Sequence, residues 1–501
     1  MRPINLVPAL SGIAMLLASC GKPPAGDRSA LTAVTSAVMG VPITTSSDAA
    51  RNHFLQGQRE LDLGRFIEAN VHFEQAVAAD SGFAFGYLNV ANTANSLQDF
   101  KTNLALAERH AAGAAEAERL LIQMARKGFD NDLEGQLALG KQLVEMYPES
   151  PRAWLALGAV QQAMNRSQEA RASMTKALEL APRLFVAHTD LGNSYLFGDP
   201  RDFAKALEHM QHAEKLAPNE PWPHDLLGDA HRALSNLVKA REEYTRAHEL
   251  SPRDASPLQQ RGHVNTFLGD YATARADYDS AIARGRANER AAFGIWRAFV
   301  SVYAGDPRAA IDELNQLVAA IDGMDVPDPR GVKTSALTNA AIIAIHSRNF
   351  PAAERALKQR SGLMMQAAAA VGTPAFRRAQ EANNAYFDAW LAARKGDYAT
   401  ARRLTDRVAT LVRPDANPRK MEPVHELQGF VALYQGNYGE AAGHFTQGNL
   451  LDIYIKYQLA LAQEGAGNTA EAKQLFREVA NNNFNNVGFG LVRKEASQKA
   501  G

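Results

Sequence analysis

The stretch that decides the fold covers residues 151–182 and reads PRAWLALGAVQQAMNRSQEARASMTKALELAP. Its small residues include Gly158 and Ala170, which allow two helices to approach closely, and its large residues include Trp154 and Leu157, which fill the space around that contact. The closing proline ends the second helix because it lacks an N–H and clashes with the preceding turn. The stretch therefore predicts a pair of packed helices.

The same pattern recurs along the chain. Glycines equivalent to Gly158 stand at positions 192, 228 and 262, so successive steps are 34, 36 and 34 residues. A fixed period of this length is typical of a helical-hairpin repeat. A single hairpin cannot cover its own apolar face, so the hairpins must stack.

These units resemble the tetratricopeptide repeat. In the first unit the places four, seven, eight, twenty, twenty-seven and thirty-two of the 34-residue frame are filled by Trp154, Leu157, Gly158, Ala170, Ala177 and Pro182. The resemblance implies an all-α solenoid of about eleven or twelve hairpins that form a right-handed superhelix.

A turn signature extends the array in both directions. It consists of a Gly or Asn, a polar residue and often an aromatic one, with an Ala three places further on, and Gly and Asn suit it because they accept a positive φ. The alanines of these turns are Ala69, Ala274, Ala310, Ala353, Ala401, Ala441 and Ala472. The repeats are thus expected from residue 50 to residue 482.

Two breaks in the rhythm suggest the domain organisation. Residues 323–331 are rich in Pro, Gly and Asp, and they predict a linker between a first lobe at 50–322 and a second lobe at 332–482. Residues 361–379 are expected either to lengthen a helix or to form an inserted hairpin. Residues 483–501 are expected to cap the last repeat, with a frayed end from Arg493 onward.

The amino terminus reads MRPINLVPALSGIAMLLASC, in which a short apolar run ends at Cys20. The run is too short to span a bilayer comfortably. Leu17-Ala18-Ser19-Cys20 resembles the lipobox of bacterial lipoproteins, which implies a signal peptide at 1–20 and acylation of the Cys20 thiol. Gly21 follows where the family has Asp for inner-membrane retention, so the outer membrane of a Gram-negative envelope, facing the periplasm, is the expected location. The alternative is an ordinary secretory signal.

A second amino-terminal segment follows this signal. Residues 21–49 are rich in Gly, Pro, Ser, Thr and Ala, and they predict a flexible tether.

Composition narrows the possible functions. Lys plus Arg and Asp plus Glu number 54 each, so no net charge directs the chain to nucleic acid. The single cysteine excludes an internal disulfide and a zinc site built on cysteines. No phosphate loop, zinc-protease motif or nucleophile elbow is complete, and no cofactor is expected. His209 and His212 have a chelating i, i+3 spacing, but no third ligand is evident, so a solvated or packing role is favoured.

The resemblance also indicates where partners bind. In the family the first helix of each unit lines a concave groove, in which places two, five, nine, twelve and thirteen of the frame are exposed. Carried onto this chain, the groove would present polar residues in the first lobe, chiefly Asn193, Asp229 and Arg232. Toward the carboxy terminus of the array it would present the aromatic residues Phe299, Tyr303, Tyr386, Trp390, Phe430, Tyr434 and Tyr457. Aromatic side chains carry much of the energy of protein interfaces. The alternative is that they pack between adjacent helices.

The sequence thus predicts a non-enzymatic adaptor that holds protein or peptide partners while a lipid anchors it to the envelope. One alternative is a self-assembling structural solenoid whose groove binds another copy. The other is an enzyme whose site lies in residues 361–379 or in the tail, where few polar groups converge.

Overall fold

A computed structural model describes residues 40–501 except 95, 325 and 327. This part of the chain contains twenty-five α-helices, labelled α3 to α27, and two short 3-10 helices, and it has no strand. Cys20 and the predicted signal peptide lie outside the described residues. None of the helices in the described residues combines the length and the apolar character that a membrane-spanning helix needs.

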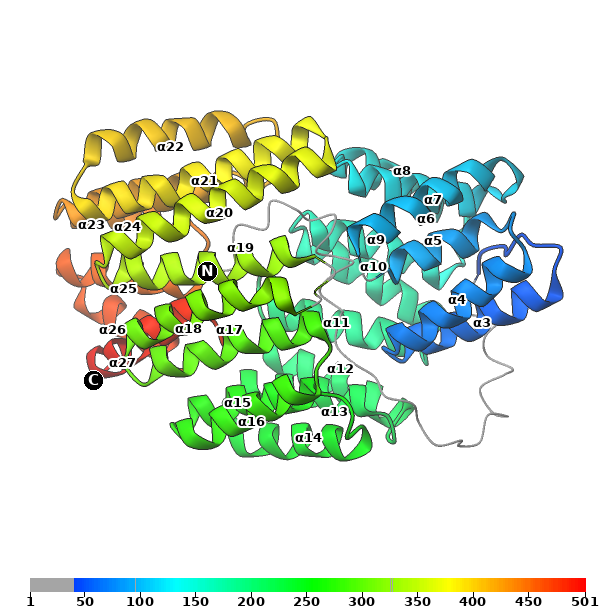
Figure 1. Cartoon of the computed structure of the whole chain (residues 1–501), viewed down its shortest axis with the longest axis horizontal. Coiled ribbons are helices and arrows are strands. Elements are labelled where there is room, and N and C mark those ends of the chain that lie inside the picture. The colour runs from blue at the N-terminus through cyan, green and yellow to red at the C-terminus, as the bar shows by residue number, and fades with distance from the viewer. Residues whose placement is uncertain (1–39, 95, 325, 327) are drawn as a thin grey trace. The chain divides into compact units, whose positions relative to one another are not determined.

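Twelve antiparallel pairs of consecutive helices, α3–α4 to α25–α26, form the array, and α27 follows them. The helices up to α14 are α3 Asp48–Asp62, α4 Phe66–Ala79, α5 Ala84–Asn92, α6 Leu97–His110, α7 Glu116–Phe129, α8 Leu133–Met146, α9 Pro151–Ala163, α10 Ser167–Leu180, α11 Phe185–Phe197, α12 Phe203–Leu216, α13 Pro221–Ala233 and α14 Leu237–Leu250. Within residues 48–250, and again within residues 256–480, each hairpin packs on the next one along the chain. The predicted all-α solenoid of stacked hairpins is confirmed (Figure 1).

The remaining helices are α15 Ser256–Phe267, α16 Tyr271–Arg284, α17 Ala287–Tyr303, α18 Pro307–Ala320, α19 Pro329–His346, α20 Phe350–Val371, α21 Pro374–Lys395, α22 Tyr398–Val412, α23 Glu422–Tyr434, α24 Tyr438–Phe445, α25 Ile453–Gly465, α26 Thr469–Ala480 and α27 Val487–Lys499. The stretch 361–379 lengthens two helices, because α20 and α21 each contain 22 residues. Gly372 ends α20 with a φ of 79°, which a glycine adopts without steric cost.

The described chain divides into two compact units. The N-terminal unit holds residues 40–234 and 238–257, and the C-terminal unit holds residues 235–237 and 258–501. The boundary therefore differs from the predicted linker at 323–331. The hairpins continue to stack across that linker, because α18 packs on α19 and Lys333 Nζ lies 2.5 Å from Asp322 Oδ2.

The contact between the two helices of a hairpin depends on small side chains. The seven turn alanines predicted from the sequence are at most 2% exposed. At the eighth frame place, an added Cβ on Gly228 would lie 2.4 Å from Cε1 of Tyr244. Tyr244 is itself completely buried, and its hydroxyl donates a hydrogen bond to Asp229 at 2.7 Å. The glycine is therefore required by the aromatic ring that faces it.

Substitution of Gly228 by Ala is expected to lower the free energy of unfolding by about 2–3 kcal/mol, because the buried, hydrogen-bonded Tyr244 ring cannot move away. Gly192→Ala is the matched control at the same frame place. Its Cβ would meet the flexible end of Met210, with Cε at 2.5 Å. That side chain can rotate, and Ala favours a helix over Gly by about 1 kcal/mol, so Gly192→Ala is expected to be nearly neutral. Urea unfolding followed by circular dichroism compares the two, and equal losses would contradict this account.

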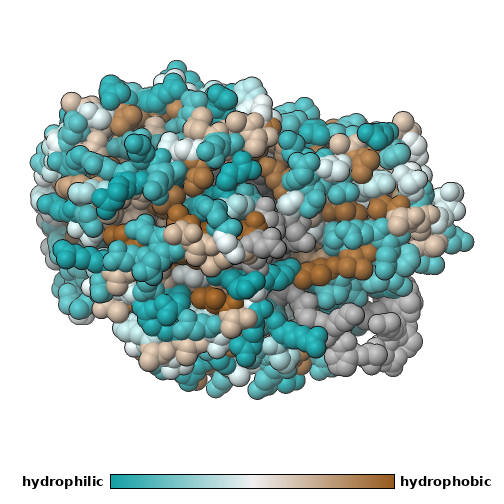
Figure 2. All heavy atoms as spheres, in the orientation of Figure 1, coloured by the Kyte–Doolittle hydropathy of each residue, from teal (hydrophilic) through white to brown (hydrophobic). Residues whose placement is uncertain are grey.

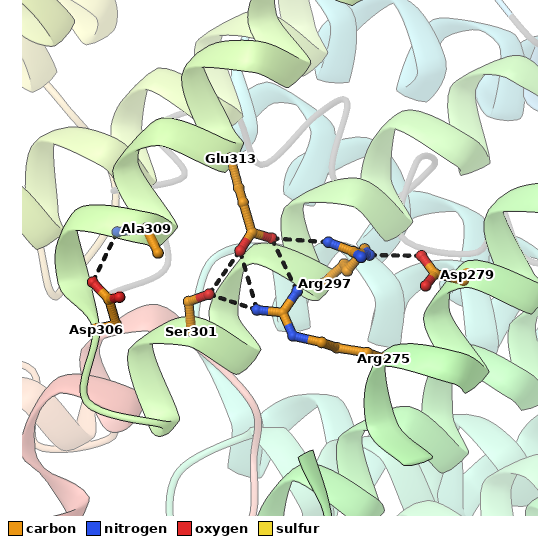
Figure 3. Close-up of polar contacts among 7 residues, drawn as sticks. All are labelled: Arg275, Asp279, Arg297, Ser301, Asp306, Ala309 and Glu313. Carbon is orange, nitrogen blue, oxygen red and sulfur yellow. Dashed lines mark hydrogen bonds and ion pairs between the residues drawn. The ribbon is translucent and has the colours of Figure 1, made fainter. Parts of the chain in front are cut away.

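Polar side chains also join successive hairpins in the C-terminal unit (Figure 3). Glu313 of α18 accepts hydrogen bonds from Arg275 of α16 at 3.1 Å and from Arg297 of α17 at 3.1 Å. Ser301 donates to the same carboxylate at 2.7 Å, and Arg297 also donates to Asp279 at 2.6 Å. The carboxylate is only 24% exposed, so this network fixes the register of three neighbouring helices.

The outer surface carries few large apolar groups. Figure 2 shows one face on which hydrophilic residues predominate and hydrophobic ones form short rows. Among the described residues the exposed large apolar side chains are Ile67, Val71, Met146, Val238, Leu268, Met421 and Tyr438. They are spread over several hairpins of both units, as isolated surface apolar residues usually are.

Candidate functional site

The aromatic residues predicted to line a groove are mostly buried in the C-terminal unit. Exposure is 0–2% for Phe299, Tyr386, Trp390, Phe430 and Tyr457, whereas Tyr303 and Tyr434 are partly buried. Most of these side chains therefore do not lie on an exposed surface, and their binding to a partner stays a prediction. The alternative, in which they pack between adjacent helices, describes their positions.

The geometry of the first helices explains this burial. The first helices α21, α23 and α25 of successive hairpins contact one another directly. Trp390 on α21 stacks on Phe430 of α23, with ring centroids 5.3 Å apart, and meets the edge of Tyr454 of α25 at 5.6 Å. Its indole Nε1 lies 3.3 Å from the hydroxyl of Tyr434. The aromatic side chains of these first helices therefore fill the space between successive hairpins.

A buried carboxyl group adjoins this aromatic cluster. Glu426 of α23 is 6% exposed and accepts hydrogen bonds from the Tyr386 hydroxyl at 2.8 Å and the Asn449 backbone N–H at 3.1 Å. Burial, followed by the charge of Asp452, raises the pKa of Glu426 to about 8. The group is thus mainly protonated at neutral pH. Sequence reasoning missed it, because its pattern is that of any glutamate on an amphipathic helix.

The polar residues predicted for the N-terminal unit behave differently from one another. Asn193 on α11 is half-buried, whereas Asp229 and Arg232 on α13 are 8% and 5% exposed. Arg232 Nη2 lies 2.5 Å from Asp229 Oδ1, and Tyr244 donates to the same carboxylate oxygen. Asp229 and Arg232 neutralise each other inside the fold, so Asn193 is the member of this set with solvent contact.

A second aspartate lies beside this pair. Burial, followed by the charges of Asp229 and Asp254, raises the pKa of Asp225 well above its usual value. Its Oδ1 atom is buried and has no hydrogen-bond partner in the described part of the chain. The helix α13 therefore carries two neighbouring carboxyl groups of different character. Asp229 is ion-paired, whereas burial disfavours the ionised form of Asp225.

Two of the predicted aromatic residues contact the carboxy-terminal segment. The Tyr303 hydroxyl donates to Asn485 Oδ1 at 2.9 Å, and Tyr457 is hydrogen-bonded to Glu495. The segment is not frayed as predicted, because α27 continues to Lys499, whose Nζ lies 2.6 Å from Glu464 Oε2. It is a packed part of the C-terminal unit.

An extended amino-terminal segment is also held by the array. The predicted tether 21–49 ends in residues 40–47, which lie across the N-terminal unit. The Thr44 N–H donates to Glu118 Oε1 of α7 at 2.7 Å, and the Thr44 hydroxyl accepts from the Ala115 N–H at 3.2 Å. Arg51 of α3 donates to the carbonyl oxygens of Ile43 and Thr45 at 2.8 Å each. This part of the predicted tether is therefore docked as an extended peptide.

The first hairpin meets later hairpins of the same unit. Arg65, in the turn between α3 and α4, is ion-paired with Glu220, and Asp62 at the end of α3 is paired with Arg152 of α9. A Cβ on Gly64 would lie 3.0 Å from the Trp222 ring of α13. Arg152 and Trp222 both occupy the second frame place of a first helix, so this turn covers positions where the family resemblance puts a partner.

The histidine pair noted in the sequence has a third neighbour. His188 Nδ1 lies 3.3 Å from His209 Nδ1, and the His188 ring stacks on His212 with centroids 5.1 Å apart. Burial is the main cause that lowers the pKa of His209 to about 4, and the charge of His188 is the second. His188 also contacts the Pro182 carbonyl through Nε2 at 3.1 Å. The described residues include no group of three side chains arranged to hold a metal ion.

Comparison with known proteins gives two matches to models described as tetratricopeptide repeat, at residues 151–184 and 455–483. No curated protein sequence matches the chain. Among solved structures, the chain is similar to MamA 41-end from Desulfovibrio magneticus RS-1, with 22% identity over 34% of this chain and 95% of that one, at a TM-score of 0.30.

Two further solved structures are similar to part of the chain. YrrB, described as a TPR protein with an unusual peptide-binding site, shares 18% identity over 36% of this chain and 91% of that one, at a TM-score of 0.27. A thermophilic TPR protein of Thermus thermophilus, TTC0263, shares 20% identity over 42% of this chain and 95% of that one, also at 0.27. The family-model matches coincide with the hairpin α9–α10 and with α25–α26. The chain therefore contains tetratricopeptide repeats.

Proposed function

We propose that the chain is a non-catalytic scaffold that binds protein or peptide partners and is anchored to the bacterial envelope by a lipid on Cys20. Repeats of this type are typically scaffolds, because stacked hairpins offer a long continuous surface. The outer membrane, facing the periplasm, is the proposed location.

One observation carries the binding part of this proposal: the array already holds two segments of its own chain. Residues 40–47 are bound as an extended peptide through Thr44 and Arg51. The helix α27 is bound through its apolar side chains, and Asn485, two residues before the helix begins, is bound through its amide group. A surface that satisfies both the backbone and the side chains of a polypeptide within one chain is suited to do the same for another chain.

A photo-crosslinking amino acid placed at Asn193 tests the binding part in the native host. Partner adducts are expected from this half-buried position on a first helix. The matched control is Glu242, which is exposed on the second helix α14, and few adducts are expected there. Equal labelling at the two positions, or no adduct at either, would contradict a partner surface on the first helices.

The anchor has an independent test. Wild-type chain grown with radioactive palmitate is expected to be labelled and to fractionate with outer membranes. Cys20→Ser is expected to lose both properties, because the thiolate is the nucleophile that receives the lipid. If the Cys20→Ser chain carries no palmitate but still fractionates with the outer membranes, a lipid on Cys20 is not the anchor.

A further inference from the structure

The carboxy-terminal helix does not simply continue the stack. It packs on α26, the last helix of the array, and also on α25, α19 and α17, which are first helices of three different hairpins. We call the side formed by α17, α19 and α25 the first-helix face. Figure 1 shows the red α27 beside the green α17, with which it shares the C-terminal unit. The chain thus covers part of its own first-helix face with a helix.

Apolar side chains anchor α27 to this face. Phe489 is completely buried, and its ring centroid lies 6.0 Å from those of Phe267 and Tyr303. Val492 and Ala496, one and two turns further along, are also at most 1% exposed. An added Cβ on Gly490 would lie 3.0 Å from the Tyr303 ring, so the helix backbone approaches the face closely.

A carboxamide is recognised next to these anchors. Oδ1 of Asn485 accepts from the Tyr303 hydroxyl at 2.9 Å, while its Nδ2 donates to His263 Nδ1 at 2.7 Å. The Tyr278 hydroxyl lies 3.4 Å from the same Nδ2. His263 stands at the ninth frame place, which the family resemblance assigns to partner binding. Both ends of the amide group are therefore satisfied by the array.

Other features weaken the hold of α27. The guanidinium of Arg493 lies over the Phe267 and Phe489 rings, but its buried Nη1 has no hydrogen-bond partner in the described part of the chain. Gly488 and Gly490 lie in the first turn of α27, and each glycine reduces helix stability by about 1 kcal/mol. Residues 481–486, which connect α26 to α27, include five asparagines and no helix. The connection thus allows α27 to leave without unfolding α26.

We propose that α27 is an internal ligand, and that a partner displaces it with a helix of the same chemistry. That helix would carry a carboxamide one turn before an aromatic residue, followed by small apolar residues on the same side. The proposal rests on the scaffold function above and names the class of partner for the C-terminal unit. A short connection gives the internal helix an effective concentration of about millimolar. A partner therefore binds the closed chain more weakly than the open one, in proportion to the open fraction.

A labelled peptide of residues 481–501 provides the test, with fluorescence anisotropy as the measurement. The full chain with Asn485→Ala and Phe489→Ala has an undocked tail, and it is expected to bind the peptide at least about tenfold more tightly than the wild type, because the competing helix is released. Lys494→Ala, at an exposed position on α27, is the matched control and should bind like the wild type. A peptide carrying Phe489→Ala should not bind.

Amide hydrogen exchange on the wild-type chain is a second test, which does not depend on the folding of the double variant. The amides of α27 are expected to exchange at least about tenfold faster than those of α25, because α27 opens separately. Equal protection of α27 and α25, or a folded double variant that does not bind the peptide, would overturn the proposal. If the wild type forms dimers and the peptide dissociates them, a second copy of the chain occupies the first-helix face. That result would also overturn the proposal. Loss of Asn193 crosslinks with retained peptide binding would instead reject the scaffold function alone.

Discussion

Replacement of Trp390 by Ala is expected to lower the free energy of unfolding of the C-terminal unit by about 4 kcal/mol, the size of effect seen when a buried Trp is truncated. The side chain is 0% exposed and packs between α21, α23 and α25. Its removal would leave a cavity among Phe430, Tyr434 and Tyr454, whose rings are fixed by their own neighbours. Urea unfolding monitored by circular dichroism measures the loss.

Two control variants separate packing from binding. Trp390→Phe keeps an aromatic ring in the stack and should lose less than half as much stability. Trp154→Ala removes a half-buried indole whose Nε1 bonds the Pro148 carbonyl at 2.8 Å, and it is expected to cost about 1–2 kcal/mol. A Trp390→Ala chain with wild-type stability and lost partner capture would restore the interpretation in which these aromatic residues face a partner.

The hairpins themselves were predictable from local spacing. Gly158, Gly192, Gly228 and Gly262 mark contacts between the two helices of one unit, and such contacts recur with the period of the sequence. The turn alanines are buried for the same reason. Interactions within one repeat are encoded by residues less than about one repeat apart, so periodicity is sufficient to find them.

Contacts between hairpins were not predictable in the same way. Trp390 and Phe430 occupy positions that the family frame places in a groove, yet they are buried because α21 and α23 touch. α21 contains 22 residues, longer than the first helices of the regular units such as α9 with 13. The frame gives the direction of a side chain on its own helix, but burial also depends on the distance to the next hairpin.

Contacts over long sequence separations were missed altogether. Asn485 reaches His263 and Tyr303, and Thr44 reaches Glu118, through single hydrogen bonds that leave no periodic signal. The asparagine-rich run before α27 has the composition of a loop. Only the folded array shows that its amide groups are bound.

Replacement of Glu426 by Gln is expected to stabilise the C-terminal unit at alkaline pH and to change little at pH 5. Burial raises the pKa of Glu426 from 4.5 to about 8, so between these values the folded chain keeps a proton that the unfolded chain releases. The free energy of unfolding therefore falls as the pH rises through this window. At 1.36 kcal/mol for each pKa unit, the full penalty above pH 8 is roughly 5 kcal/mol as an upper limit.

Gln is a close substitute for the protonated glutamate. Its carbonyl oxygen can accept from the Asn449 N–H, and its amide can donate to the Tyr386 oxygen. Urea unfolding of the wild type and Glu426→Gln at pH 5 and pH 8.5 measures the difference, with Glu440→Gln, at an exposed position on α24, as the control. The Gln variant should lose the decline with pH that the wild type shows, whereas Glu440→Gln should keep it. Parallel pH profiles for the wild type and Glu426→Gln would mean that the buried carboxyl group titrates as it does in the unfolded chain.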